Sequence, residues 1–379
     1  MVSLTNLKDW YKGDTTTLLI ALLTISIITW YLYLYFFKSK TQNLPPGPPG
    51  FPIFGNLLSL DPELHTYFAG LAQAHGPIYK LWLGSKLGIV LTSPSTARQV
   101  LKDHDTVFAN RDVPAAGRAA TYGGNDIVWT PYGPQWRMLR KICVVKMLSN
   151  TTLDSVYELR RGEVRKTVGY IHDRVGSTVN VGEQVFLTVL NVITNMMWGA
   201  GVEGEDDWMI GERLKKEEDG KENNGSRDFL QFLLNLKEEG DSKTPFTNTH
   251  VKALLMDMVV GGSDTSSNTI EFVMAEMMNK PEVMRKVQEE LETVVGKDNL
   301  VEESHIHKLT YLHAVMKETL RLHPALPLLV PHCPSETTNI GGYTIPEGSR
   351  VFINVWAIHR DPYVWENPLE FDPYKVLGW

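Results

Sequence analysis

The sequence predicts a mainly α-helical protein that carries small β-sheets and has an N-terminal transmembrane helix. Three observations lead to this fold class. An uncharged apolar run occupies residues 15–37, several later segments repeat apolar residues with a helical period, and pairs of short β-like runs flank glycine-containing turns. With 379 residues, 43% of them hydrophobic, the chain is long enough to bury a large core.

Charge and cysteine content exclude several classes of function. The formal net charge is -7 and the basic residues are scattered, so we expect no nucleic-acid partner. The two cysteines, Cys143 and Cys333, are far apart and lack metal-ligand spacing. Neither a disulfide framework nor a zinc site is therefore indicated, and the chain is typical of an intracellular protein in a reducing compartment.

Residues 1–40 are predicted to form a membrane anchor. No residue from Thr15 to Phe37 is charged, and this run supplies the roughly 20 apolar residues that a helix needs to cross a bilayer core. Its aromatic end, from Trp30 to Phe37, suits a membrane interface. The alternative is a cleaved signal peptide, but the run is longer than the apolar region of such a peptide and lacks a clear small-residue cleavage site.

A proline-rich hinge at residues 41–50 follows the anchor. The segment from Leu44 to Gly50 consists of proline and glycine after its leucine. Proline fixes φ and removes a backbone donor, so we expect a stiff spacer that joins neither helix nor sheet. Residues 51–379 would then form the globular body.

The first half of the body predicts one hairpin and several helices. The β-like runs Ile78–Leu83 and Leu87–Thr92 flank a turn at residues 84–86. Helical patterns occupy residues 94–104, 133–143, 154–175 and 181–198. Residues 201–225 are polar, charged and glycine-containing, which predicts a mobile surface linker.

The second half predicts three further helices and a second hairpin. Apolar stripes and helix-boundary residues place the helices at residues 251–277, 281–294 and 311–323. The runs 342–345 and 351–355 flank Pro346-Glu347-Gly348, which favours a hairpin between them.

One candidate site lies inside the long helix at residues 251–277. Gly261 and Gly262 each cost about 1 kcal/mol relative to alanine in a helix interior, so the backbone there is expected to need close approach of a ligand or of another helix. Asp264 and Thr265 follow at once and could relay protons into an apolar site. The alternative is a glycine-rich packing contact beside a solvated aspartate.

Two further residue pairs indicate a functional site only when they are considered together with the other motifs. Glu318 and Arg321 share a helix face at i, i+3 and can pair, although such pairs are usually on the surface. Trp136 and Arg140, at i, i+4, offer an aromatic wall and a cation for an anionic group, or belong to an ordinary amphipathic helix. The residues around His305 are expected to be a polar helix start rather than a metal site.

The order of these features resembles the microsomal cytochrome P450 family over nearly the whole chain. The proline hinge is followed by the Trp136–Arg140 helix, by the Gly261–Thr265 motif and by the Glu318–Arg321 pair. The resemblance implies a cytochrome P450 fold and haem b as cofactor. By the motif matches, the cofactor-binding residues are Trp136, Arg140 and His332, the catalytic residues are Asp264 and Thr265, the structural ion pair is Glu318 with Arg321, and the residues near the substrate pocket are Gly261, Ala325, Leu328, Leu329 and Val330.

The resemblance also implies an activity, a partner and a location. Plant members of the family hydroxylate small hydrophobic secondary metabolites with O2 and with electrons from NADPH–cytochrome P450 reductase. Phrases such as residues 129–133 resemble the plant enzymes and favour terpenoid-like substrates, with flavonoids or phenolics close behind. The expected location is the endoplasmic reticulum membrane, with a single pass and the body facing the cytosol.

Three departures from the family are visible. The family's axial cysteine lies in a loop beyond the Phe371-Asp372-Pro373 motif, and this sequence ends at Trp379 without such a loop. The segment 201–225 is shorter than the family's substrate roof, and Lys375 stands where the family usually has arginine. Metal ligation by this chain is therefore not expected. The second hypothesis is a non-catalytic, membrane-tethered fragment from a truncated gene model, a splice form or a pseudogene.

Overall fold

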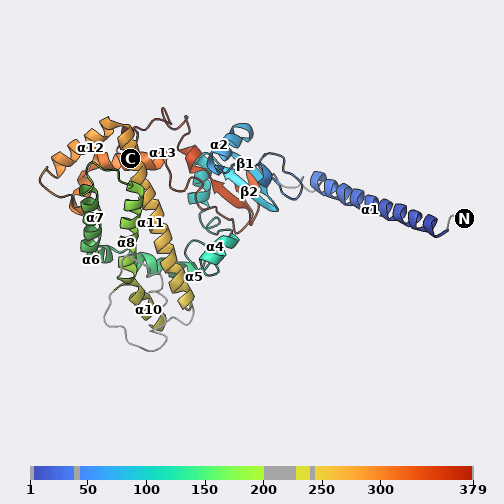
Figure 1. Ribbon diagram of the computed structural model, residues 1–379, viewed down its shortest axis with the longest axis horizontal. Helices are drawn as coiled ribbons and strands as arrows, with labels where there is room; N and C mark the ends of the chain where they lie inside the picture. The colour runs from blue at the N-terminus through green and yellow to red at the C-terminus, as the bar shows by residue number, and fades with distance from the viewer. Residues whose placement is uncertain (1–3, 38–42, 200–227, 240–243, 378–379) are drawn as a thin grey trace.

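The computed structural model describes residues 4–37, 43–199, 228–239 and 244–377 of the protein. The architecture is mainly helical with two small sheets, as the sequence predicts (Figure 1). Most of the long helices gather in one part of the body, and the three-stranded sheet, with shorter helices beside it, lies in another part, nearer to helix α1. The predicted linker at residues 201–225 lies outside the described residues.

Helix α1 (Leu4–Phe37) projects away from the body (Figure 1). The side chains of residues 15–30 are exposed, including Leu19, Leu23 and Trp30. Among the residues that the structure describes, no helix has a stretch long and apolar enough to cross a membrane.

The proline-rich hinge packs against the body. Lys80 donates its backbone N–H to Pro46 O at 2.7 Å, and Asn43 exchanges hydrogen bonds with the chain at residues 342–344. A Cβ built on Gly47 would meet Lys80 O at 2.0 Å, so glycine is required by close backbone contact. The hinge forms no helix or strand, but its described part is fastened to the sheet-bearing part of the body.

Strand β1 (Ile78–Leu83) pairs with β2 (Lys86–Leu91) in an antiparallel hairpin, which confirms the first predicted hairpin. β5 (Arg350–Ile353) joins the other edge of β2 in parallel, with Gly88 opposite Arg350. The second sheet contains β3 (Thr338–Ile340) and β4 (Tyr343–Ile345) in antiparallel pairing.

The predicted hairpin between residues 342–345 and 351–355 is wrong. The strand β4 turns back on β3 instead, through Gly341 and Gly342, whose φ angles are +58° and +84°. A two-residue hairpin turn with both central residues at positive φ favours glycine. The glycine pair that meets this requirement lies before β4, between β3 and β4, and not after it. The side chains of Val351, Phe352 and Ile353 are buried, which matches the partnership of β5 with β2.

The helical predictions agree with the structure within a few residues for the long segments. Pro134 and Pro281 stand at the first positions of α5 and α12, and Gly199 ends α8 in the left-handed conformation. The predicted helix at 154–175 is divided at Val156 into two helices. The helical segments are η1 (Leu57–Ser59), α2 (Leu64–His75), α3 (Pro94–Arg98), η2 (Gln99–Asp103), α4 (Ala115–Ala120), α5 (Pro134–Ile142), η3 (Cys143–Met147), α6 (Asn150–Ser155), α7 (Tyr157–His172), α8 (Val181–Trp198), α10 (Phe229–Glu239), α11 (Asn248–Asn279), α12 (Pro281–Val294), η4 (Glu303–Lys308), α13 (Thr310–Leu322), α14 (Val355–Ile358) and η5 (Pro373–Val376).

Helix α11 organises the helical core. Its first turns pack with α5, α8 and α10 around buried residues such as Leu139, Leu233 and Leu254. Farther along, Val273 and Met277 pack with α12 and α13 around Val315. The middle of α11, where the candidate catalytic residues lie, is thereby held from both ends.

Candidate functional site

The middle of α11 presents an exposed face with apolar side chains. Val260 is 55% exposed, and Met256, Ile270 and Phe272 are also exposed. Ser263 and Ser267 of the same helix are buried. A central helix that leaves this much apolar surface open has room beside it for an apolar ligand.

The two adjacent glycines of α11 have different surroundings. A Cβ built on Gly262 would lie 2.6 Å from Ile193 Cδ1, so this glycine permits close packing of α8. A Cβ built on Gly261 would meet nothing within 4 Å. The packing alternative from the sequence therefore describes Gly262, whereas Gly261 leaves an open backbone on the exposed face.

Asp264 and Thr265 follow Gly261 on α11. The Asp264 carboxylate is exposed, whereas Thr265 is partly buried and donates its hydroxyl hydrogen to Gly261 O at 2.9 Å. Thr269 in turn donates to Thr265 O at 2.7 Å. Thr265 Oγ1 is thus fixed near the Gly261 backbone and keeps its lone pairs available as acceptors.

Helix α5 carries the predicted pair Trp136 and Arg140. Trp136 Nε1 donates to Ile127 O at 3.0 Å, which holds the indole ring in place. The exposed Arg140 guanidinium lies over this ring, with Cζ 5.6 Å from the ring centroid. A cation held above an aromatic face, without an ion pair in the described part of the chain, suits an anionic ligand.

His332 is buried beside β5 and hydrogen-bonded to the chain near α3 and η2. Its Nδ1 contacts Phe108 O at 2.6 Å and donates there in the neutral tautomer, and its backbone exchanges two hydrogen bonds with Val351. Burial, together with the nearby Arg111 charge, lowers the pKa of His332 to about 4. The ring is therefore neutral at pH 7, with Nε2 as an acceptor.

Asn110 joins the segments that carry these residues. Its side-chain Oδ1 accepts from Tyr132 N at 2.8 Å, and its backbone oxygen accepts from Cys333 N at 2.8 Å. The neighbouring Arg111 donates to Val330 O. The segments 108–111, 132–140 and 330–333 are consequently tied together through Asn110 and Arg111.

Sequence reasoning missed Asn110 and Arg111. Burial lowers the pKa of the Arg111 guanidinium from its ordinary value, and among the described residues no ion pair involves it. A partly buried arginine that lacks an acidic partner is a strong signal for an anionic ligand, but it depends on burial, which the sequence does not display. Arg111 and Arg140 supply two cations, which fits a group with two carboxylates.

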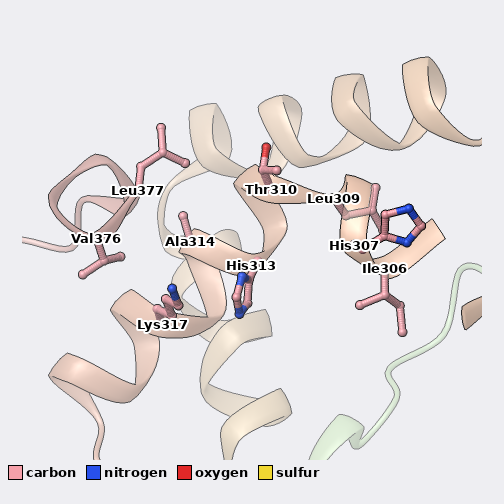
Figure 2. Close-up of a pocket in the computed structure, with 9 residues that line it drawn as sticks. All are labelled: Ile306, His307, Leu309, Thr310, His313, Ala314, Lys317, Val376 and Leu377. Atoms are coloured by element: carbon pink, nitrogen blue, oxygen red, sulfur yellow. The ribbon is translucent and has the colours of Figure 1, made fainter. Parts of the chain in front are cut away.

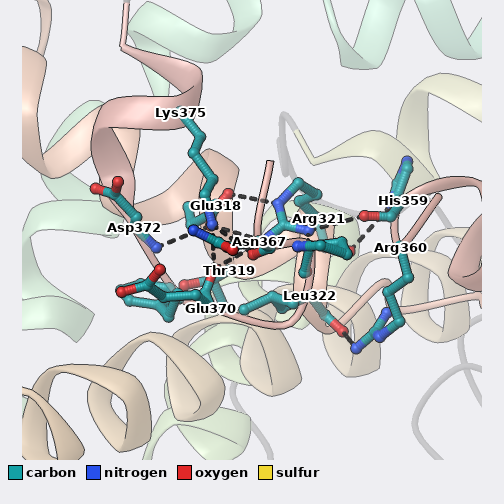
Figure 3. Close-up of polar contacts among 12 residues, drawn as sticks. Glu318, Thr319, Arg321, Leu322, His359, Arg360, Asn367, Glu370, Asp372 and Lys375 are labelled. Atoms are coloured by element: carbon teal, nitrogen blue, oxygen red, sulfur yellow. Dashed lines mark hydrogen bonds and ion pairs between the residues drawn. The ribbon is translucent and has the colours of Figure 1, made fainter. Parts of the chain in front are cut away.

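Glu318 and Arg321 form a buried ion pair in α13, with exposed fractions of 0% and 3% (Figure 3). Arg321 Nε and Nη2 donate to the carboxylate at 2.7 and 2.8 Å. Its remaining hydrogens are donated to the carbonyl oxygens of His359, Pro368 and Glu370. This is the well-bonded arrangement that a buried pair requires.

Lys375 does not pair with Glu318. It donates instead to Asn367 O and Glu370 O, each at 2.8 Å (Figure 3). Asp372 donates its backbone N–H to Glu318 Oε1 at 2.9 Å. The Glu318–Arg321 pair and its carbonyl partners, which we call the C-terminal knot, fix the course of residues 359–375.

The predicted pocket residues after α13 lie near the sheet. Leu328 packs on the cluster around Phe68, and Leu329, with φ +51°, packs on the cluster around Ile78. His323, which precedes them, stacks on Phe272 of α11 at a centroid distance of 4.5 Å. Phe272 follows Gly261 by eleven residues, or roughly 16 Å along the helix.

A separate cavity of about 560 Å³ lies at the start of α13 (Figure 2). Ile306, His313, Lys317 and Val376 are among the residues that line it. None of the predicted catalytic or cofactor-binding residues is among them, so this cavity is distinct from the exposed face of α11.

Neither cysteine fits the role of an iron ligand. Cys143 is buried between α5 and α11, where its Sγ contacts Met258 Sδ at 3.6 Å. Cys333 lies in the bridge to Asn110 and is partly buried. Burial raises the pKa of both thiols, whereas a ligand must be a thiolate. The cationic residues fit a dicarboxylate such as haem b, and the two thiols do not fit its iron.

Comparison with known proteins identifies the family. The cytochrome P450 family model matches residues 45–212 and 208–377, so the break between the two matches falls within the polar segment 201–225. A flavonoid 3'-monooxygenase of Petunia hybrida is 36% identical over 93% of this chain and 79% of that protein. A geraniol 8-hydroxylase of Swertia mussotii is 34% identical over 96% of this chain and 84% of that protein.

The fold agrees with solved structures of the same family. A zebra fish cytochrome P450 structure with progesterone superposes with a TM-score of 0.73 at 25% identity, over 84% of this chain and 85% of that one. By its family match and by its relatives, the chain belongs to the cytochrome P450 family.

Proposed function

We propose that this chain forms the main part of a haem-thiolate monooxygenase that hydroxylates a small hydrophobic plant secondary metabolite, of terpenoid or of flavonoid and phenolic type. The observation that carries the proposal is the exposed face of α11, where Gly261 and Thr265 border open, apolar surface. The relatives named as flavonoid and geraniol hydroxylases support this substrate range.

Family membership implies a haem cofactor, a redox partner and a small substrate. When bound, haem supplies the activation of O2. In this chain, Arg140 above Trp136 and the partly buried Arg111 would hold the two propionates by charge-assisted hydrogen bonds. His332, which is neutral, would meet a propionate with its Nε2 only after gaining a proton.

The proposed task of α11 is proton delivery. The exposed Asp264 carboxylate exchanges protons with solvent, and Thr265 Oγ1 passes a proton toward the open side of Gly261 by leaving its hydrogen bond to Gly261 O. The apolar side chains of Val260 and Met256 would exclude water from the same surface once a substrate covers them.

The proposed setting is the endoplasmic reticulum membrane. The uncharged run 15–37 within α1 would anchor the chain in a single pass, with the body in the cytosol and NADPH–cytochrome P450 reductase as the electron donor. Helix α1 projects from the body, which suits an anchor, and Tyr31 Oη contacts Ile53 N at 3.1 Å at the junction.

The iron ligand defines the decisive experiment. Neither Cys143 nor Cys333 fits as the thiolate ligand, so the experiment asks whether an added C-terminal segment can supply one. We would express two proteins with haem available: the printed chain, and a fusion that continues after Leu377 with the C-terminal residues of the Petunia hybrida relative. The measurement is the reduced carbon-monoxide difference spectrum of each.

The fusion is expected to show a thiolate-type Soret band, and the printed chain is not. A folded fusion without this band would overturn the monooxygenase proposal and favour a non-catalytic, membrane-tethered fragment. A thiolate band from the printed chain that disappears in Cys333→Ser, but not in Cys143→Ser, would instead show that our reading of the cysteines is wrong.

The role of Thr265 is tested in the same fusion with the reductase present. Thr265→Ala is expected to keep the Soret band but to lower product formation by roughly 10²–10⁴-fold, the usual contribution of a positioned proton donor. Thr265→Ser retains the hydroxyl and should recover most of the rate. Equal rates in all three proteins would remove Thr265 from the mechanism.

A further inference from the structure

A buried carboxyl group lies in the segment between α4 and α5. Asp126 is 0% exposed, and its Oδ1 accepts from Trp129 N at 2.8 Å. Its Oδ2 is buried and has no donor from any side chain or backbone group in the described part of the chain. An isolated buried carboxylate is very costly, so this oxygen requires either a cation or a proton.

Its neighbour is the carboxyl group of Asp257 on α11. Asp257 Oδ2 accepts from Ile127 N at 2.6 Å, which fastens the segment that carries Asp126 to the long helix. Because Ile127 directly follows Asp126, this bond brings the Asp257 carboxyl group next to the buried carboxyl group of Asp126. Two carboxylates have no donor between them, so a hydrogen bond between these groups requires that one of them is protonated.

The surroundings of the pair favour a proton over a cation. Among the described residues, no ion pair involves Asp126 or Asp257. Two titratable or charged groups of α5 and η3 lie on this side. Besides burial, which raises the pKa of the Cys143 thiol, the nearby Arg140 charge lowers this pKa and the Asp257 charge raises it. Burial is the main cause that raises the pKa of Asp257, to about 7, and burial also raises the pKa of Asp126.

We propose that Asp126 and Asp257 form a carboxyl pair that shares one proton, and that this protonated pair fastens residues 121–133 to α11. We call the protonated pair the clasp. The clasp holds Ile127, whose carbonyl oxygen accepts from Trp136 Nε1. The pair is therefore a positioning device for Trp136 and, through the ring beneath it, for the Arg140 guanidinium.

The clasp responds to pH because the pair titrates as a unit. With one proton, both carboxyl groups are satisfied and the segment is fastened. After loss of this proton, two like charges face each other in a poorly hydrated space, and the segment is released or takes up water. The proposal concerns this segment of the chain itself and does not depend on haem binding or on the proposed activity.

The test is amide hydrogen exchange of the full chain in detergent, followed in peptides that cover residues 121–133 between pH 5.5 and 8.5. Protection factors, corrected for the intrinsic pH dependence of exchange, are compared with those of the β1–β2 hairpin. In the wild-type protein the protection of 121–133 is expected to fall at least tenfold over this range, while that of the hairpin stays constant.

Variants separate a shared proton from ordinary structural support. In Asp257→Asn the amide donates to Asp126 and its oxygen still accepts from Ile127 N, so protection should remain high and independent of pH. Asp126→Asn offers the reciprocal arrangement and the same expectation. Asp257→Ala removes the clasp, and protection should be low at every pH.

Two outcomes would overturn the proposal. One is a wild-type protection of residues 121–133 that does not change between pH 5.5 and 8.5. The other is low protection in both asparagine variants, equal to that in Asp257→Ala, while circular dichroism shows that all of them are folded. Either result would mean that the carboxylates act without a shared proton.

Discussion

The C-terminal knot and the middle of α11 differ in how their polar groups are bonded and exposed. In the knot, Arg321 donates to one carboxylate and three carbonyl oxygens, and Glu318 accepts from Asp372 N as well. In the middle of α11, Asp264 is exposed and Gly261 borders open space. The knot completes its own hydrogen bonds and serves the fold, whereas the exposed groups of α11 are those that we propose to face a ligand.

The largest expected effect comes from breaking the knot. Arg321→Ala leaves the buried Glu318 carboxylate without its partner, so we expect the free energy of unfolding to fall by about 3–5 kcal/mol. Urea unfolding followed by circular dichroism measures it. The matched control is Arg285→Ala, whose exposed pair with Glu289 spans 3.8 Å, with an expected change below about 0.5 kcal/mol. Similar losses in both variants would remove the distinction.

His332 combines features of the knot and of the middle of α11: its ring is buried, but it is a predicted cofactor-binding residue. Its pKa is lowered in the folded state to about 4, so the unfolded chain binds the extra proton as pH falls below about 6.5. Stability is therefore fully present above pH 6.5 and is lost toward pH 4, by roughly 3 kcal/mol.

His332→Asn tests this assignment, because its amide can still donate to Phe108 O but does not titrate. The variant should lose most of the wild-type slope between pH 6.5 and 4 in chemical unfolding. An unchanged slope would place the titration on other histidines, such as the partly buried His359, whose pKa burial also lowers.

The two glycines of α11 sharpen the comparison within one helix. Gly262→Leu forces a side chain against Ile193 and is expected to lower the free energy of unfolding by about 1–3 kcal/mol. Gly261→Leu enters open space and is expected to raise it by up to about 1 kcal/mol, since leucine favours the helix more than glycine. Thermal and urea unfolding of both variants are compared, and a loss in Gly261→Leu would show that the exposed face is covered by protein.

The smallest effect is expected on the exposed face itself. Val260→Ala should change the free energy of unfolding by less than about 0.5 kcal/mol, because this side chain is 55% exposed. Val251→Ala, at a fully buried position of the same helix, should lower it by roughly 1–3 kcal/mol. Equal losses in urea unfolding would contradict the open face.

Local sequence patterns predicted much of the fold. The β1–β2 hairpin follows from alternating strands around Gly84, and α11 to α13 follow from apolar stripes bounded by Pro281 and Gly296. The partner of β5 was mistaken, because a parallel pairing with β2 has no local signal, whereas Pro346-Glu347-Gly348 suggested a nearby turn.

The candidate site was predicted less completely for a related reason. Thr265, Trp136 and Arg140 stand in local motifs, so the sequence displays them. Asp126 and Asp257 meet across 131 positions, and the importance of Arg111 depends on burial. Long-range contacts and burial arise only when the chain is packed, so these residues were found only in the structure.

The pairing of β2 with β5 also has a consequence for the biogenesis of the protein. Gly88 and Arg350 are opposite each other, although about 260 residues lie between them in the chain. At roughly 5–20 residues per second, a ribosome needs about 13–50 s to make that interval. During this time the edge of β2, with Ile89, Val90 and Leu91, has no native partner strand. We expect the nascent chain to depend on chaperones until β5 has emerged.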